Sequence, residues 1–100
     1  MNEVTALLRA EIDLQEAYER HSTPRLARAY EITIRDAFDQ LARHPLSGGE
    51  FLGGYRRLVL PRLGYALFYV LEGRRVVIHA LLDLRQSPET IRQRLGLPPI

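Results

Sequence analysis

Cysteine and lysine are both absent from this chain of 100 residues. Without cysteine the chain has no disulfide framework, no thiolate metal site and no cysteine nucleophile. No apolar run approaches the roughly 20 residues that a membrane span requires. The first residues also lack a basic stretch followed by an apolar one, so we expect no secretory signal and a cytoplasmic protein.

The composition is that of an ordinary folded protein, with 46% hydrophobic and 26% charged residues. Low hydrophobicity and one-signed charge, the marks of intrinsic disorder, are missing. A chain of this length fits one compact domain, and we expect residues 1–100 to form it.

Charge is divided unevenly along the chain. All 14 basic residues are arginine; residues 1–50 hold 6 of them with 9 acids (net −3), and residues 51–100 hold 8 with 3 acids (net +5). A basic second half favours an anionic partner, either nucleic acid or an acidic protein segment. A genome rich in G and C produces the same arginine bias with no functional meaning.

Apolar residues recur at helical spacing through the first half. Val4 to Leu8 predicts a short strand, and the stripe that follows predicts a helix over 10–21. Thr23 and Pro24 are typical of a helix start, which predicts a second helix over 24–43. Two helices joined by so short a turn form an antiparallel hairpin.

The second half has the pattern of strands separated by short turns. Residues 45–54 contain Gly48, Gly49, Gly53 and Gly54 and predict a flexible surface loop. Strands are expected over 55–60, 65–71 and 75–82, and a short helix from Pro88 to about Leu95. The predicted fold is α+β with two layers: the helical hairpin packs on one face of a curved, mainly antiparallel sheet (β-α-α-β-β-β plus a short C-terminal helix). The opposite face, with its arginines, is expected to be the functional one.

Few residues have the spacing of a catalytic or metal site. His21, His44 and His79 are scattered, so we expect no metal and no cofactor. Arg56 and Arg57 are adjacent on a strand and should point to opposite faces. The tyrosines at 55, 65 and 69 are expected to pack with their hydroxyls hydrogen-bonded.

Four motifs in register resemble the RelE/ParE toxin superfamily, on its ParE-like branch. Its A-x-x-D-L-x-E helix matches residues 10–16, and its L-x-x-x-P-x-x-G helix exit matches residues 41–48. Its strand motif resembles Tyr55-Arg56-Arg57 with Tyr65 to Tyr69, and its R-x-x-P tail resembles Arg85 to Pro88. The resemblance covers residues 4–95 and agrees with the predicted order of elements.

What the resemblance implies is the toxin of a type II toxin–antitoxin pair, silenced by a cognate antitoxin protein. ParE-like members with an established target poison DNA gyrase, whereas RelE-like members cut messenger RNA on the ribosome. The chain departs from the nuclease pattern: it has no lysine, and Ala66 stands where the strand motif has arginine. RNA cleavage needs a base, an acid and phosphate stabilisation, and arginine is too basic to shuttle protons efficiently at neutral pH.

Three hypotheses therefore stay open. In the first, the chain is a gyrase inhibitor with no catalysis of its own, which contacts its target through Arg56, Arg57, Arg62 and Arg85. In the second, it is a ribosome-dependent endoribonuclease that uses Arg57, His79 and Arg85, with Glu50 as a further acid–base group. In the third, it is a non-toxic module that only binds an antitoxin. For the antitoxin contact itself, the candidates are Leu14, Tyr18 and Arg57, at a groove beside the hairpin or at a sheet edge.

Overall fold

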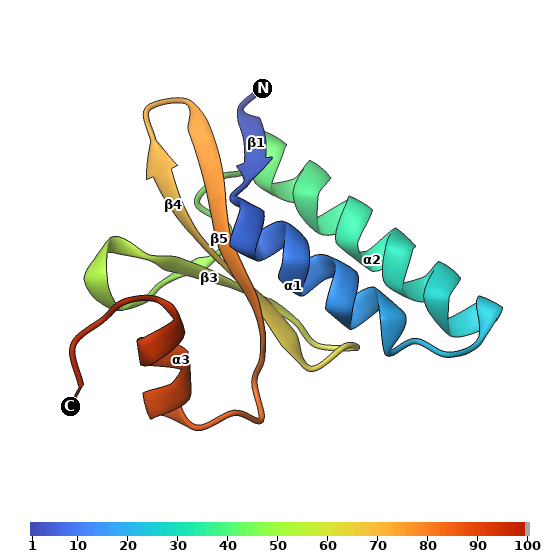
Figure 1. The fold of residues 1–100 in the computed structure, drawn as a ribbon. Helices are drawn as coiled ribbons and strands as arrows, with labels where there is room; N and C mark the ends of the chain where they lie inside the picture. The colour runs from blue at the N-terminus through green and yellow to red at the C-terminus, as the bar shows by residue number, and fades with distance from the viewer. Residues whose placement is uncertain (100) are drawn as a thin grey trace.

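A computed structural model describes residues 1–99, which form one five-stranded sheet and three helices (Figure 1). The elements are β1 (Glu3–Ala6), α1 (Leu8–Glu19), α2 (Pro24–Arg43), β2 (Gly49–Glu50), β3 (Arg56–Leu60), β4 (Tyr65–Glu72), β5 (Arg75–Asp83) and α3 (Pro88–Arg94). A short 3₁₀ turn, η1 (Leu52–Gly54), joins β2 to β3. The strand order is β1-β5-β4-β3-β2, and only the β1–β5 pair in these residues is parallel. The predicted α+β, mainly antiparallel fold is confirmed.

The helical hairpin of α1 and α2 covers one face of the sheet, as Figure 1 shows. The larger hydrophobic cluster lies between these two layers, and we call it the helix-side core. Its buried members are Ala10, Ala17, Tyr30, Ala37, Leu41, Leu58, Leu60, Tyr65, Leu67, Tyr69, Val76, Ile78 and Leu81. The bounds predicted for α2 are confirmed, and the Thr23 hydroxyl caps it by accepting the backbone N–H of Leu26 at 3.1 Å.

The opposite face of the sheet is partly covered by α3. A second cluster, the α3-side core, joins Ile91 and Leu95 to sheet residues Ala66, Phe68, Ala80 and Leu82. The expectation of an open face lined with arginine is therefore wrong for this half of the sheet. The reason is the apolar side chains on that face, which alone would leave a hydrophobic surface in water.

A β-bulge at His79 divides β5 into two parts. Phe68 of β4 pairs with Ala80, whereas the next residue, Tyr69, pairs with Ile78, so His79 is the extra residue. The bulge changes the alternation: Ile78 belongs to the helix-side core and Ala80 to the α3-side core. It lets one strand contribute apolar side chains to both cores.

Some predicted bounds are corrected by the structure. The first strand spans 3–6 instead of 4–8, and the first helix spans 8–19 instead of 10–21. The segment 45–54 holds β2 and η1. Gly48 is buried there, and its backbone N–H donates to the Tyr69 hydroxyl at 3.0 Å, so the prediction of a flexible loop is wrong at this residue. Across residues 1–99, no helix is both long and apolar enough to cross a membrane.

Candidate functional site

Arg57 lies on the α3 side of the sheet and is exposed. Its guanidinium carbon is 5.3 Å from the centre of the Phe51 ring. The Phe51 ring in turn packs edge-on against Phe68, with 5.3 Å between ring centres and 72° between ring planes. A cation over an aromatic face is attracted by the ring quadrupole, so the guanidinium is held in one place.

Arg56 points to the other side of the same strand, as its position beside Arg57 predicted. Its Nε donates to the Gly48 carbonyl at 3.0 Å and its Nη2 to the Leu46 carbonyl at 3.3 Å. The Glu50 carboxylate is 3.7 Å from its Nη1. Arg56 therefore ties the α2–β2 loop to β3, and most of its hydrogen-bonding capacity is used within the chain.

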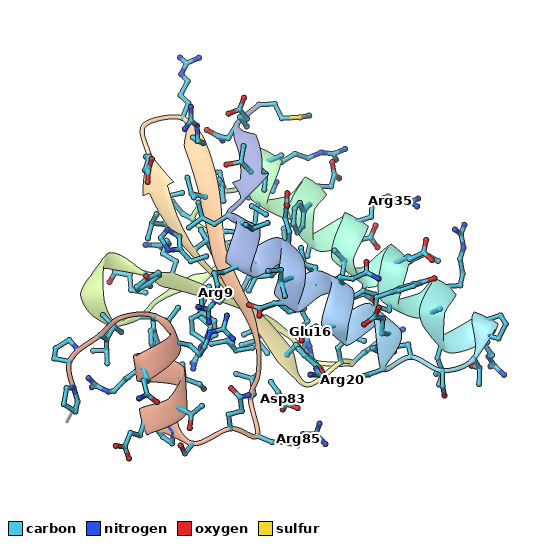
Figure 2. All side chains as sticks on the ribbon, viewed as in Figure 1. Arg9, Glu16, Arg20, Arg35, Asp83 and Arg85 are labelled. Atoms are coloured by element: carbon cyan, nitrogen blue, oxygen red, sulfur yellow. The ribbon has the colours of Figure 1, made fainter. Side chains whose placement is uncertain are left out.

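A second charged group lies where α1 and β5 end, at the same end of the molecule (Figure 2). Arg20 donates to the Tyr65 hydroxyl at 2.8 Å, and Arg85 forms an ion pair with Asp83 at 2.6 Å. The hydrogen bonds from the Arg85 side chain and backbone lower the pKa of Asp83 to about 2. The pKa of Arg20 is raised, first by its hydrogen bond to Tyr65. Arg85 is thus already paired within the chain.

His79 is half-buried beside Tyr55, with its ring edge-on and 5.2 Å between ring centres. The Tyr55 hydroxyl donates to the Leu95 carbonyl at 3.0 Å, so its oxygen is left to accept from His79 Nδ1 at 3.3 Å. Burial raises the pKa of Tyr55. The predicted hydroxyl bonds of Tyr55, Tyr65 and Tyr69 are all present, the last donating to the Pro45 carbonyl at 2.7 Å.

The nuclease candidates Arg57, His79 and Arg85 are not gathered at one point. Arg57 pairs with Phe68, which pairs with Ala80, so Arg57 and His79 lie two strands apart on one face. Arg85 follows the far end of β5, where Asp83 holds it. Glu50 lies on β2 at the sheet edge beside Arg56.

An apolar groove of about 430 Å³ runs between α2 and the end of β3. Ile32, Ala37, Val59, Leu60 and Pro61 supply its apolar lining, and Thr33, Asp36, Gln40 and Arg62 its polar lining. Ile32 and Val59 are each 41% exposed, which is high for apolar side chains. Strand β2 pairs with β3 only at Arg56 and Arg57, so the outer edge of β3 beyond Arg57 is unpaired within residues 1–99.

The predicted antitoxin contacts lie in different places. Leu14 is half-buried against the helix-side core, and its carbonyl accepts the Tyr30 hydroxyl at 2.7 Å. Tyr18 is 37% exposed on α1, and its ring lies 6.0 Å from that of Tyr30. Arg57 lies on the opposite face of the sheet from both. The structure therefore gathers Leu14 and Tyr18 but places Arg57 apart from them.

Sequence reasoning missed a buried ion pair between α1 and α3. The Asp13 carboxylate accepts from Arg94 Nη2 at 2.8 and 3.0 Å and from the Leu81 backbone N–H at 3.1 Å. The aspartate of the helix motif was the available signal, but 81 residues separate it from Arg94. No cluster of ligands suited to a metal ion occurs among the described residues.

Comparisons with known proteins place this arrangement in a family. A family model described as the ParE toxin of the type II toxin–antitoxin system parDE matches residues 6–88. A comparison with curated proteins returned no match. A solved structure titled as a chromosomal ParDE TA system from P. aeruginosa is similar at a TM-score of 0.72 and 19% identity. The match covers 85% of this chain and 98% of that one, and at this identity it shows a shared fold.

Proposed function

This chain belongs to the ParE toxin family of type II toxin–antitoxin systems, and from that membership we propose that it inhibits DNA gyrase by direct contact until a cognate antitoxin neutralises it. The observation that carries the proposal is the family match over residues 6–88, on a fold shared with a ParDE structure. DNA gyrase acts on the chromosome, so the proposed place of action is the cytoplasm.

The arrangement of the basic residues supports inhibition by contact over RNA cleavage. Cleavage through the 2′-hydroxyl needs a base, an acid and a phosphate-binding cation within hydrogen-bond reach of one substrate. Arg85 is paired with Asp83 away from Arg57 and His79. Among these groups, His79 alone titrates near neutral pH when unperturbed. We therefore propose a toxin that is not itself catalytic.

For the antitoxin, we propose the groove between α2 and β3 as the binding surface. An extended segment can pair with the free outer edge of β3 and place alternate apolar side chains in the groove beside Ile32 and Val59. The charged rim of Asp36 and Arg62 would fix its register. Leu14, a candidate from sequence, is part of the helix-side packing and is a weaker choice.

The test is pulse labelling of DNA and protein synthesis in one culture after induction of this chain alone. We expect DNA synthesis to fall first, with supercoiling lost from a reporter plasmid. A prior fall in protein synthesis would contradict the gyrase target and favour the ribosome-dependent nuclease. If neither falls and the chain still binds the product of the adjoining gene, the non-toxic binding module is correct.

A further inference from the structure

The side chains of Arg57, Phe51 and Phe68 form a continuous stack that runs from solvent into the α3-side core. Phe68 is fully buried, Phe51 is partly buried against it, and Arg57 is exposed above Phe51. The two contacts, 5.3 Å from guanidinium to ring and 5.3 Å from ring to ring, restrict how far the cation can move. We call these residues the Arg57 stack. A side chain fixed in this way loses less conformational entropy when a partner binds.

The guanidinium of the Arg57 stack is also free of an internal anion. Arg56, Arg85 and Arg94 each have an acidic partner within the chain. Among the described residues, Arg57 takes part in none of the salt bridges or side-chain hydrogen bonds, and its contact is the Phe51 ring. Its positive charge is thus fixed, exposed and not neutralised.

The surroundings of the Arg57 stack suit a protein partner better than a nucleic acid. Binding to a phosphate backbone uses a row of cations. Here the adjacent Arg56 points to the other face, and its near neighbour Glu50 carries a negative charge. Aromatic rings and arginine are the residue types most enriched at protein interface hot spots. The exposed Leu52 in the adjoining turn adds apolar surface.

We propose that the Arg57 stack is the anchoring contact for an acidic side chain on the target protein. This inference rests on the proposed function, because it assumes that the chain acts by binding a protein. It assigns Arg57 to target recognition, out of the target, antitoxin and nuclease roles that its sequence position allows. The carboxylate of the target pairs with the guanidinium, and apolar groups beside it pack on Leu52 and the edge of Phe51.

The test compares variants in growth arrest and in inhibition of purified DNA gyrase. Arg57→Ala should reduce both about tenfold or more, which is typical of a hot-spot residue. Phe51→Leu keeps an apolar contact with Phe68 but removes the ring beneath the guanidinium, so a smaller, severalfold loss is expected. Arg74→Ala is the matched control, since Arg74 is an exposed arginine in the turn between β4 and β5. Thermal unfolding establishes that each variant is folded.

Four results would overturn the proposal. Arg57→Ala may retain full growth arrest, or it may lose affinity for the antitoxin while growth arrest remains, which would assign Arg57 to the antitoxin site. Loss of growth arrest together with lost binding to a duplex DNA oligonucleotide alone would make the partner a nucleic acid. Wild-type chain that arrests no growth would overturn both this inference and the proposed function. If wild type arrests growth but leaves gyrase untouched, the gyrase assignment fails, and loss of arrest in Arg57→Ala but not in Arg74→Ala still supports the Arg57 stack.

Discussion

Asp13 and Arg94 form an ion pair at 2.8 Å that connects the first helix to the last across 81 residues of chain. The Asp13 carboxylate is 9% exposed and also accepts the backbone N–H of Leu81 in β5. One side chain therefore holds α1, β5 and α3 together. Its position explains why α3 stays on the sheet although α3 spans only Pro88–Arg94.

Replacement of Asp13 by asparagine should destabilise the fold. The change leaves Arg94 without its counter-charge and weakens the bond from Leu81. Loss of one partner from a fully buried pair costs roughly 3–5 kcal/mol, and because the Arg94 side chain is 26% exposed we expect about 2–3 kcal/mol. Urea unfolding measures it.

Asp39→Asn is the matched control for this prediction. Asp39 pairs with Arg43 at 3.2 Å on the surface of α2, with 50% and 59% of the two side chains exposed. Its loss should cost about 0.5 kcal/mol or less. Equal effects of the two substitutions would show that the Asp13–Arg94 pair has no special role.

Gly48→Ala should be destabilising for steric reasons alone. A methyl group at Gly48 would lie 2.6 Å from the Tyr69 hydroxyl oxygen, 2.8 Å from its Cε1 and 3.0 Å from the Arg57 carbonyl carbon. Tyr69 is fully buried and cannot move aside, so we expect a cost of about 1–3 kcal/mol in the free energy of unfolding. At Gly49 a methyl group meets nothing within 4 Å, and Gly49→Ala should be close to neutral. A neutral Gly48→Ala would contradict the observed packing.

Stability should fall in alkaline solution because of Tyr30. Burial raises the pKa of Tyr30 from 10.0 to about 12. The unfolded chain then ionises first, so the contribution is complete below pH 10 and is lost as the pH rises through about 12. A shift of this size corresponds to about 2–3 kcal/mol. Tyr30→Phe should reduce the slope of stability against pH in this range.

The same Tyr30→Phe change should cost about 1 kcal/mol at neutral pH, through the lost bond to the Leu14 carbonyl. Tyr18→Phe removes a hydroxyl from the more exposed neighbouring ring and serves as the control. If wild type and Tyr30→Phe lose stability in parallel between pH 10 and 12, the titration of Tyr30 is not the cause.

Val59→Glu should impair antitoxin binding while the fold survives. Val59 is 41% exposed and lines the groove between α2 and β3, so a carboxylate there would have to be desolvated when an apolar side chain enters. We expect at least tenfold weaker binding to the product of the adjoining gene, measured by calorimetry. Leu8→Glu, at a 71% exposed position on α1, is the control and should bind normally. Unchanged binding by Val59→Glu would place the antitoxin elsewhere.

Local sequence patterns were enough to predict most elements of the fold. The stripe of α2 and its Thr23 cap are short-range signals, and the predicted bounds 24–43 were correct. The opposite orientations of Arg56 and Arg57 follow from strand geometry alone. The hydrogen-bonded tyrosines were predicted because a buried hydroxyl needs a partner.

What the sequence could not reveal depends on contacts between distant segments. The parallel pairing of β1 with β5 joins residues about 70 positions apart and leaves no local pattern. The bulge at His79 lies within a nearly continuous apolar run, so alternation could not expose it. For the same reason the α3-side core and the Asp13–Arg94 pair were not foreseen. The contact between Arg57 and Phe51 required the path of η1, which brings the loop back over β3.

The most direct test of the account is supercoiling by purified DNA gyrase in the presence of increasing amounts of this chain. The account predicts that supercoiling falls and cleavage complexes accumulate, and that an equimolar amount of the cognate antitoxin reverses both effects. Gyrase activity unchanged at concentrations of the chain that arrest growth in cells would contradict it.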